Sequence, residues 1–106
     1  MANKIMSEKL PNQASFEFDD TKNKGEAEIM VNQSEIGFIH AQLDNPNGEF
    51  DIIIEDQVGN PQYTERGCKN PTGRWGKRID LPVVDSRYKI RLENVKGCKS
   101  INVFAE

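Results

Sequence analysis

The sequence predicts an all-β protein, an antiparallel β-sandwich of about seven or eight short strands with jelly-roll-like connections. Extended segments of alternating apolar and polar residues recur along the chain, and turn-forming residues separate them at intervals of roughly 8–12 residues. No segment shows the apolar period of a convincing amphipathic helix. With 106 residues, the chain is long enough for one domain with a single modest core.

The first predicted strands follow a polar N-terminal segment. Residues 1–13 are polar, and Pro11 would break a helix in them. They are therefore expected to form a flexible segment outside the sandwich domain, which spans residues 14–106. Four strands are predicted in the first half of the chain, over residues 14–19, 26–32, 35–44 and 50–56. The apolar residues that share one face of each strand are Phe16 and Phe18, then Ala27, Ile29 and Val31, then Ile39, Ala41 and Leu43, and finally Phe50, Ile52 and Ile54.

The segment over residues 38–60 is predicted to hold the centre of the fold. Two extended runs flank a turn-forming cluster at residues 44–48, and the second run, residues 50–55, is the most apolar and β-branched stretch of the chain. A hairpin this apolar belongs in the middle of a sheet rather than at its edge. After it, residues 57–74 form the longest irregular stretch, broken only by a short predicted strand over residues 62–65.

The last third of the chain completes the predicted sandwich. A strand is predicted over residues 75–84, with Pro82 marking an edge position or the end of the strand. Residues 86–95 show the cleanest alternation in the protein, and residues 100–105 supply the final strand. The inward residues of these two strands are Tyr88, Ile90 and Leu92, followed by Ile101 and Val103. Because Gly97 makes a turn between them, the two strands are expected to pair as an antiparallel hairpin.

The charge distribution excludes some classes of function. The net charge is −3, composed of −6 over residues 1–53 (10 acidic and 4 basic side chains) and +3 over residues 54–106 (7 acidic and 10 basic). An acidic chain without a concentrated basic footprint is not expected to bind nucleic acid. No apolar run approaches the length of a membrane span, and no signal peptide is visible, so the compartment is left open.

Two cysteines, Cys68 and Cys98, lie in matching Gly-Cys-Lys contexts that are predicted to be loops. They are too few for a four-ligand zinc site, since His40 is the only histidine. A disulfide between them would require an oxidising compartment and would point to an extracellular protein. The alternative is two thiols that are not bonded to each other, which would point to the cytoplasm. The sequence leaves both possibilities open.

The chain from residue 37 to its end resembles the bacterial pre-peptidase C-terminal domain and the related collagen-binding domains of clostridial collagenases. The similarity lies in the strand at residues 37–43, in residues 47–56 with the Gly59-Asn60 turn that follows, and in the strand at residues 88–94 with Gly97. The resemblance implies a jelly-roll-like sandwich. It also implies calcium, which the collagen-binding relatives bind.

Carboxylates are hard-oxygen ligands of the kind that calcium takes. Those in and beside the predicted turns are Asp19, Asp20, Asp44, Asp51, Glu55 and Asp56. Asp51 and Asp56 are the calcium candidates, although the sequence contains no EF-hand spacing. The alternatives are that these carboxylates are solvated, or that two of them form a glycosidase pair. No other cofactor is expected.

The segment over residues 68–78 is the predicted site, in the form of a loop. It holds the only tryptophan, Trp75, between glycines and four basic side chains. A tryptophan in this setting stacks on a sugar ring or anchors a protein interface, and the basic side chains hold an acidic group. The predicted binding residues are Tyr63, Arg74, Trp75, Lys77 and Arg78. The alternative is that Trp75 caps the end of the sandwich core.

The function predicted from these observations is a non-catalytic binding module that recognises a protein or a glycan through the 68–78 loop. One alternative is a self-assembling structural protein of a virion or a cell surface. The other is a small hydrolase that uses His40 with a carboxylate, although no serine or cysteine lies near enough to His40 in the sequence to indicate a triad.

Overall fold

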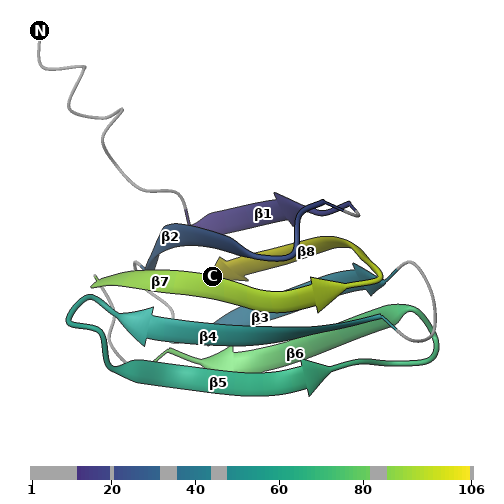
Figure 1. The fold of residues 1–106 in the computed structure, drawn as a ribbon. Helices are drawn as coiled ribbons and strands as arrows, with labels where there is room; N and C mark the ends of the chain where they lie inside the picture. The colour runs from purple at the N-terminus through teal and green to yellow at the C-terminus, as the bar shows by residue number, and fades with distance from the viewer. Residues whose placement is uncertain (1–11, 20, 32–35, 44–47, 82–85, 106) are drawn as a thin grey trace, which may run out of the picture.

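The computed structural model describes residues 12–19, 21–31, 36–43, 48–81 and 86–105. These residues form eight strands: β1 (Gln13–Glu17), β2 (Gly25–Val31), β3 (Ile36–Leu43), β4 (Glu49–Asp56), β5 (Pro61–Cys68), β6 (Arg74–Asp80), β7 (Ser86–Lys96) and β8 (Cys98–Ala105). The strands make two sheets of four, sheet A in the order β1-β8-β3-β6 and sheet B in the order β2-β7-β4-β5, stacked face to face (Figure 1). The described ranges contain no helix long and apolar enough to cross a membrane. All eight predicted strands are confirmed, with ends that differ by a few residues.

The strand order is that of a jelly roll, in which the chain passes repeatedly from one sheet to the other. Every neighbouring pair of strands runs antiparallel. Only β4 and β5 are both consecutive in the chain and neighbours in a sheet. The predicted antiparallel, jelly-roll-like sandwich is therefore confirmed.

Two predicted hairpins are wrong. β3 and β4 each lie in the middle of a sheet, as expected of the 38–60 segment, but β3 belongs to sheet A and β4 to sheet B. β7 and β8 are likewise in different sheets, although only Gly97 separates them. The two connections meet at one end of the sandwich, where a Cβ on Gly48 would lie 2.2 Å from the carbonyl oxygen of Gly97. Gly97 has a φ of 59°, and this left-handed turn carries the chain across to the other sheet.

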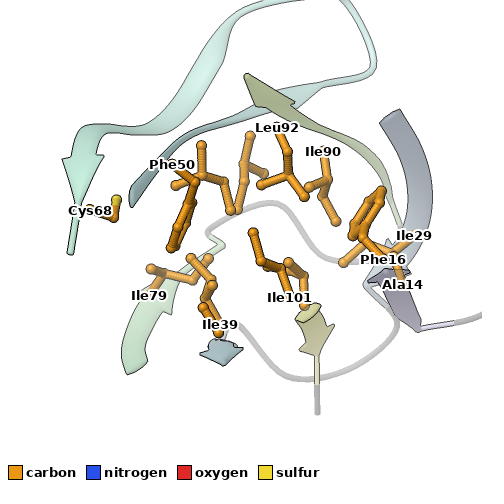
Figure 2. Close-up of a cluster of buried hydrophobic side chains, with 14 of the residues drawn as sticks. Ala14, Phe16, Ile29, Ile39, Phe50, Cys68, Ile79, Ile90, Leu92 and Ile101 are labelled. Carbon is orange, nitrogen blue, oxygen red and sulfur yellow. The ribbon is translucent and has the colours of Figure 1, made fainter. Parts of the chain in front are cut away.

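The core is filled by the inward faces of both sheets. Ile39, Ile79 and Ile101 of sheet A point toward Phe50, Ile90 and Leu92 of sheet B (Figure 2). The inward residues predicted for β7 and β8 are all buried. Alternation with a period of two therefore identifies the inward face of these strands correctly, although it does not identify their partners.

The stretch predicted to be irregular is largely strand. β5 ends at Cys68 and β6 begins at Arg74, so the predicted 68–78 loop shrinks to a five-residue turn, residues 69–73. In this turn the amide of Gly73, at a φ of 85°, donates to the carbonyl oxygen of Asn70 at 3.0 Å. β5 and β6 are edge strands of their sheets. Edge strands carry many charged and polar residues, which is why the apolar signal of a strand is weak here.

The predicted N-terminal segment, residues 1–13, lies mainly outside the described residues. Its last residue, Gln13, opens β1. Asn12 is tied to the end of β8, where its side-chain amide donates to the carbonyl oxygen of Ala105 at 3.0 Å. The backbone amide of Ala105 in turn donates to the carbonyl oxygen of Asn12 at 2.9 Å. The chain is thus fixed to sheet A from Asn12 onward.

Candidate functional site

The side chains that point away from the core on sheet A form an ordered grid. β3 lies between β8 and β6, so each of its outward residues has a neighbour on either side. The register sets three rows across β8, β3 and β6, which are Phe104–Phe38–Arg78, Asn102–His40–Gly76 and Ser100–Gln42–Arg74. On the far side of β8, β1 extends these rows with Gln13, Ser15 and Glu17. We call this surface the sheet-A face.

Three rings gather on the sheet-A face. The rings of Phe38 and Phe104 stack, with their centroids 5.4 Å apart and their planes at 26°. The ring of His40 meets Phe104 edge-on, at 5.4 Å and 87°. His40 is exposed and both phenylalanines are half-buried, although all three lie on the side of the sheet away from the core. The face therefore offers an aromatic surface where a solvated sheet usually carries polar residues.

A shallow groove of about 410 Å³ opens on the sheet-A face around His40. Ala41 and Trp75 line it, and its polar or open positions are His40, Gln42, Arg74, Gly76, Ser100 and Asn102. These residues supply an imidazole, two amides, a hydroxyl and a guanidinium, so the groove presents both hydrogen-bond donors and acceptors. We call it the sheet-A groove.

Gly76 keeps the groove open. It lies opposite His40 in the register, between Arg74 and Arg78 on the outward side of β6. A Cβ on Gly76 would lie 3.6 Å from His40 Cδ2, an ordinary contact distance, and the φ of Gly76 is not in the left-handed region. The fold therefore does not require glycine at this position. A glycine inside a strand weakens the strand and commonly marks a place where a ligand approaches the backbone closely.

The outward face of sheet B is different in kind. Several of its charged side chains form ion pairs, which are Lys89–Glu26 (3.5 Å), Arg91–Glu55 (3.3 Å), Arg91–Glu93 (2.7 Å), Arg66–Asp51 (3.3 Å) and Lys96–Glu49 (3.6 Å). Apart from Arg66–Asp51, whose carboxylate is buried, these pairs are partly exposed and add little stability, but they balance the charge of the surface. This face has the character of an ordinary solvated sheet.

The structure divides the predicted binding residues between two surfaces. Arg74 and Arg78 lie on the sheet-A face. Trp75 and Lys77 have the opposite parity on β6 and lie on its inward side. Trp75 is half-buried against the core, with its ring edge-on to Phe50 at 5.2 Å and 85°. This packing matches the alternative in which Trp75 caps the core.

Tyr63 and Lys77 meet at Glu65, between the two edge strands. The Tyr63 hydroxyl donates to a carboxylate oxygen of Glu65, and Lys77 Nζ lies 3.6 Å from the same oxygen. Burial, followed by the hydrogen bond to Glu65, raises the pKa of Tyr63 above its usual value. These contacts join β5 of sheet B to β6 of sheet A. A role for Tyr63 and Lys77 in binding stays a prediction.

Most of the sheet-A face is missing from the site predicted from the sequence. The residues concerned are Phe38, His40, Gln42, Gly76, Ser100, Asn102 and Phe104. The alternation along β3 and β8 does place most of them on the outward side of their strands. Alternation does not reveal the register, and the register is what brings β8, β3 and β6 together as one surface.

Asp51, one of the two calcium candidates, is a buried carboxylate on β4. It accepts hydrogen bonds from the Asn94 side chain (2.8 Å), from the Gly67 amide (2.8 Å) and from Arg66 Nη1 (3.3 Å). Burial alone would raise the pKa of Asp51, but the three hydrogen bonds outweigh burial and hold this pKa below its usual value. The ionised carboxylate therefore joins β4 to β5 and β7.

Asp56, the other candidate, organises the turn between β4 and β5. One of its oxygens accepts from the amides of Val58 (3.1 Å) and Asn60 (2.9 Å), and the other accepts from the Gln62 side chain (3.1 Å). The hydrogen bond from the Asn60 amide is the chief cause of the lowered pKa of Asp56. Within the described ranges, no three His, Cys, Asp or Glu side chains are placed to hold a metal ion. The calcium site stays a prediction.

The candidate disulfide between Cys68 and Cys98, one of the two alternatives left open by the sequence, is not formed. Both residues are buried thiols, one at the end of β5 in sheet B and the other at the start of β8 in sheet A. Cys68 Sγ donates to the carbonyl oxygen of Glu65 at 3.7 Å, and Cys98 Sγ donates to that of Gln42 at 3.6 Å. Burial, and next the charge of Glu65, raises the pKa of Cys68 to about 12, which leaves this thiol inert at neutral pH. The alternative of two separate thiols is the one observed.

His40, the residue of the hydrolase alternative, has neutral residues beside it in its own row. The register places Asn102 and Gly76 on either side of it, and its ring contacts Phe104. The described part of this face brings no carboxylate into the row of His40. A hydrolytic role gains no support from this arrangement.

Comparison with known proteins places the fold. No protein-family model and no curated protein matches this chain. A solved protein from Sulfurospirillum deleyianum aligns at 12% identity and a TM-score of 0.58, over 91% of this chain and 98% of that one. The pre-peptidase C-terminal domain of collagenase from Bacillus anthracis aligns at 7% identity and a TM-score of 0.56, over 90% and 88%. A family 35 carbohydrate-binding module from Clostridium thermocellum aligns at 11% identity and a TM-score of 0.46, over 92% and 91%. The two similarities with TM-scores above 0.5 concern the fold alone, and the one to the collagenase domain confirms the structural resemblance to the pre-peptidase C-terminal domain.

Proposed function

We propose that this domain is a non-catalytic binding module and that it holds a glycan on the sheet-A face. The observation that carries the proposal is the pairing of a partly exposed aromatic cluster with an open polar groove on one sheet surface. The proposal moves the binding surface predicted from the sequence from the 68–78 segment to the middle of sheet A. Arg74 and Arg78 belong to both versions.

The chemistry of the surface matches that of a sugar. The apolar C–H faces of a pyranose pack on aromatic rings, and Phe104 and His40 present rings beside the groove. Gln42, Ser100 and Asn102 place amides and a hydroxyl within the same groove, where they can exchange hydrogen bonds with sugar hydroxyls. A volume of about 410 Å³ lies within the range of small-ligand sites. A stable protein interface instead covers about 800 Å² on each partner, which favours the glycan over the protein partner.

The first test removes the aromatic surface and, separately, fills the groove. The wild-type domain is screened on a broad glycan array, and the glycans that bind are titrated by calorimetry against Phe104→Ala and Gly76→Leu. Both variants are expected to weaken binding by about tenfold or more, since one lost stacking contact or one blocked subsite corresponds to about 1.4 kcal/mol. Gly76→Leu should keep the wild-type melting temperature to within a few degrees, because a Cβ at this position meets its neighbours at an ordinary contact distance of 3.6 Å and the backbone is not in the left-handed region.

The matched control lies away from the sheet-A face. Val58, at the β4–β5 turn, is 74% exposed, and Val58→Ala should leave both binding and stability unchanged. The proposal fails if no glycan on the array binds, or if the glycans that bind do so equally well to Gly76→Leu.

A further inference from the structure

We infer that the glycan held in the sheet-A groove carries a carboxylate, as uronic acids do, and that Arg74 binds this carboxylate. The inference rests on the function proposed above and adds the chemical class of the ligand. It follows from the charges around the groove.

Two arginines flank the open position at Gly76. Arg74 lies in the row of Gln42 and Ser100, and Arg78 lies in the row of Phe38 and Phe104. Alternate residues of a strand are about 6.6–6.8 Å apart, so each arginine Cα stands at about that distance from Gly76, on opposite sides, and the two are about 13 Å from each other. Both side chains are exposed, and Arg74 lines the groove itself.

Within the described residues, neither guanidinium forms an ion pair with a carboxylate. No described ion pair includes Arg74 or Arg78, whereas Arg66, Lys89, Arg91 and Lys96 on sheet B each have a carboxylate partner. The described carboxylates on the sheet-A face are Glu17 and Asp80. Glu17 is in the row of Arg74 but three strands away, a distance of ~14 Å at the usual strand spacing. Asp80 lies beyond Arg78, toward the end of β6.

A carboxylate is the anion that these groups fit best within a sugar-sized groove. The guanidinium of an arginine presents parallel N–H groups, and these match the two oxygens of a carboxylate. A pyranose on the His40 ring would cover the open position at Gly76, which lies opposite His40 in the register. Its carboxylate would then reach Arg74, while Gln42 and Ser100, in the same row as Arg74, remain for the neighbouring hydroxyls.

The experiment compares charged and neutral forms of the same sugar. Trisaccharides of galacturonic, glucuronic and mannuronic acid are titrated by calorimetry beside their methyl esters, which keep the ring and lose the charge. A sulfated trisaccharide tests the other common anion of glycans. At least one uronic acid should bind about tenfold or more tightly than its ester, and its affinity should fall as salt is added, because salt screens exposed charges.

Variants of the arginine separate a specific contact from general attraction. Arg74→Gln should lower the affinity for the acid by about tenfold and leave the affinity for its ester unchanged. Arg74→Lys should lower the affinity for the acid by an intermediate factor, because lysine keeps the charge without the paired donors. Arg87→Gln is the control, since it removes the same charge from an exposed side chain on sheet B. It should leave all affinities within about twofold of wild type, a difference well under 1 kcal/mol.

The outcomes distinguish this inference from the proposed function. Esters that bind as tightly as the acids, with binding lost in Phe104→Ala, would overturn the carboxylate and leave the glycan module standing. Preference for the sulfated sugar, or equal losses in Arg74→Gln and Arg87→Gln, would also overturn it. An array without any bound glycan would overturn both.

Discussion

Replacing Phe50 with alanine is expected to lower the free energy of unfolding by about 3 to 5 kcal/mol. Phe50 is completely buried on β4, an inner strand of sheet B, and its ring lies edge-on to Trp75 of sheet A. Truncation removes the apolar contacts of the ring and leaves a cavity between the sheets, because the strands around it are held by their own hydrogen bonds. A small domain has only about 5–15 kcal/mol of stability, so this loss leaves it close to unfolding.

Urea unfolding followed by circular dichroism measures this loss. Trp75→Ala should cost less, since Trp75 is only half-buried. The double variant should reveal a coupling of about 0.5–1.5 kcal/mol, the usual range for an aromatic pair. A loss below about 1 kcal/mol for Phe50→Ala would contradict the packing described here. Stability of Trp75→Ala equal to wild type would return Trp75 to the list of candidate ligand-binding residues.

Replacing Asp51 with asparagine is expected to cost about 2 kcal/mol at neutral pH. The carboxylate accepts from Asn94, Gly67 and Arg66, and an asparagine side chain offers one neutral oxygen together with an NH₂ group that faces these donors. Asn94, one of these donors, has a φ of 52°, in the left-handed region that asparagine adopts more readily than most residues. The free energy of unfolding from urea melts of the two proteins gives the difference.

The pH dependence gives an independent check on Asp51. Its pKa in the folded protein is lowered, so its contribution is fully present above the pKa of the unfolded chain, which is about 3.9. The contribution is lost as the pH falls through the folded pKa. The difference in the free energy of unfolding between wild type and Asp51→Asn should therefore become smaller below about pH 4. An undiminished gap in acid would contradict the role given to the charge. Asp80 is an exposed carboxylate on sheet A, and Asp80→Asn should leave the free energy of unfolding the same as in the wild type across this pH range.

The sequence predicts the strands correctly because the alternation of apolar and polar residues that marks a strand is a local pattern. Tyr88, Ile90 and Leu92 alternate with charged residues, and a half-buried strand requires that pattern whatever its partner is. β5 was the hardest strand to predict in full. It is an edge strand whose residues are mostly exposed or half-buried, so few of its positions need to be apolar.

Strand pairing was not accessible, because it depends on contacts between distant parts of the chain. A glycine between two alternating strands favours a hairpin in most sequences. Here Gly97 instead turns the chain into the other sheet, where it meets Gly48 from a different connection. That contact joins positions 49 residues apart (97 − 48), and no local pattern reports it.

The sequence does not group the residues of the sheet-A face, and the reason is partly the same. Trp75 shares its parity with Ile79, a buried residue, so parity alone was enough to direct Trp75 toward the core. The grouping of Phe38, His40 and Phe104 required the pairing of β3 with β8. Chemistry that is spread over three strands becomes visible only when their register is known.

The jelly-roll order also has a kinetic consequence. Only β4 and β5 can pair by closing a short turn, since every other neighbouring pair joins strands that are separated by at least two others in the chain. The entropy of closing these long loops must be lost before most of the sheet hydrogen bonds form. Chains of this type have high contact order and fold in roughly milliseconds to seconds, far more slowly than helical bundles of the same size. Before the sheets form, the apolar segments that become β3 and β4 are exposed, and they are the segments most prone to pair between chains. Rapid dilution should therefore favour refolding over aggregation.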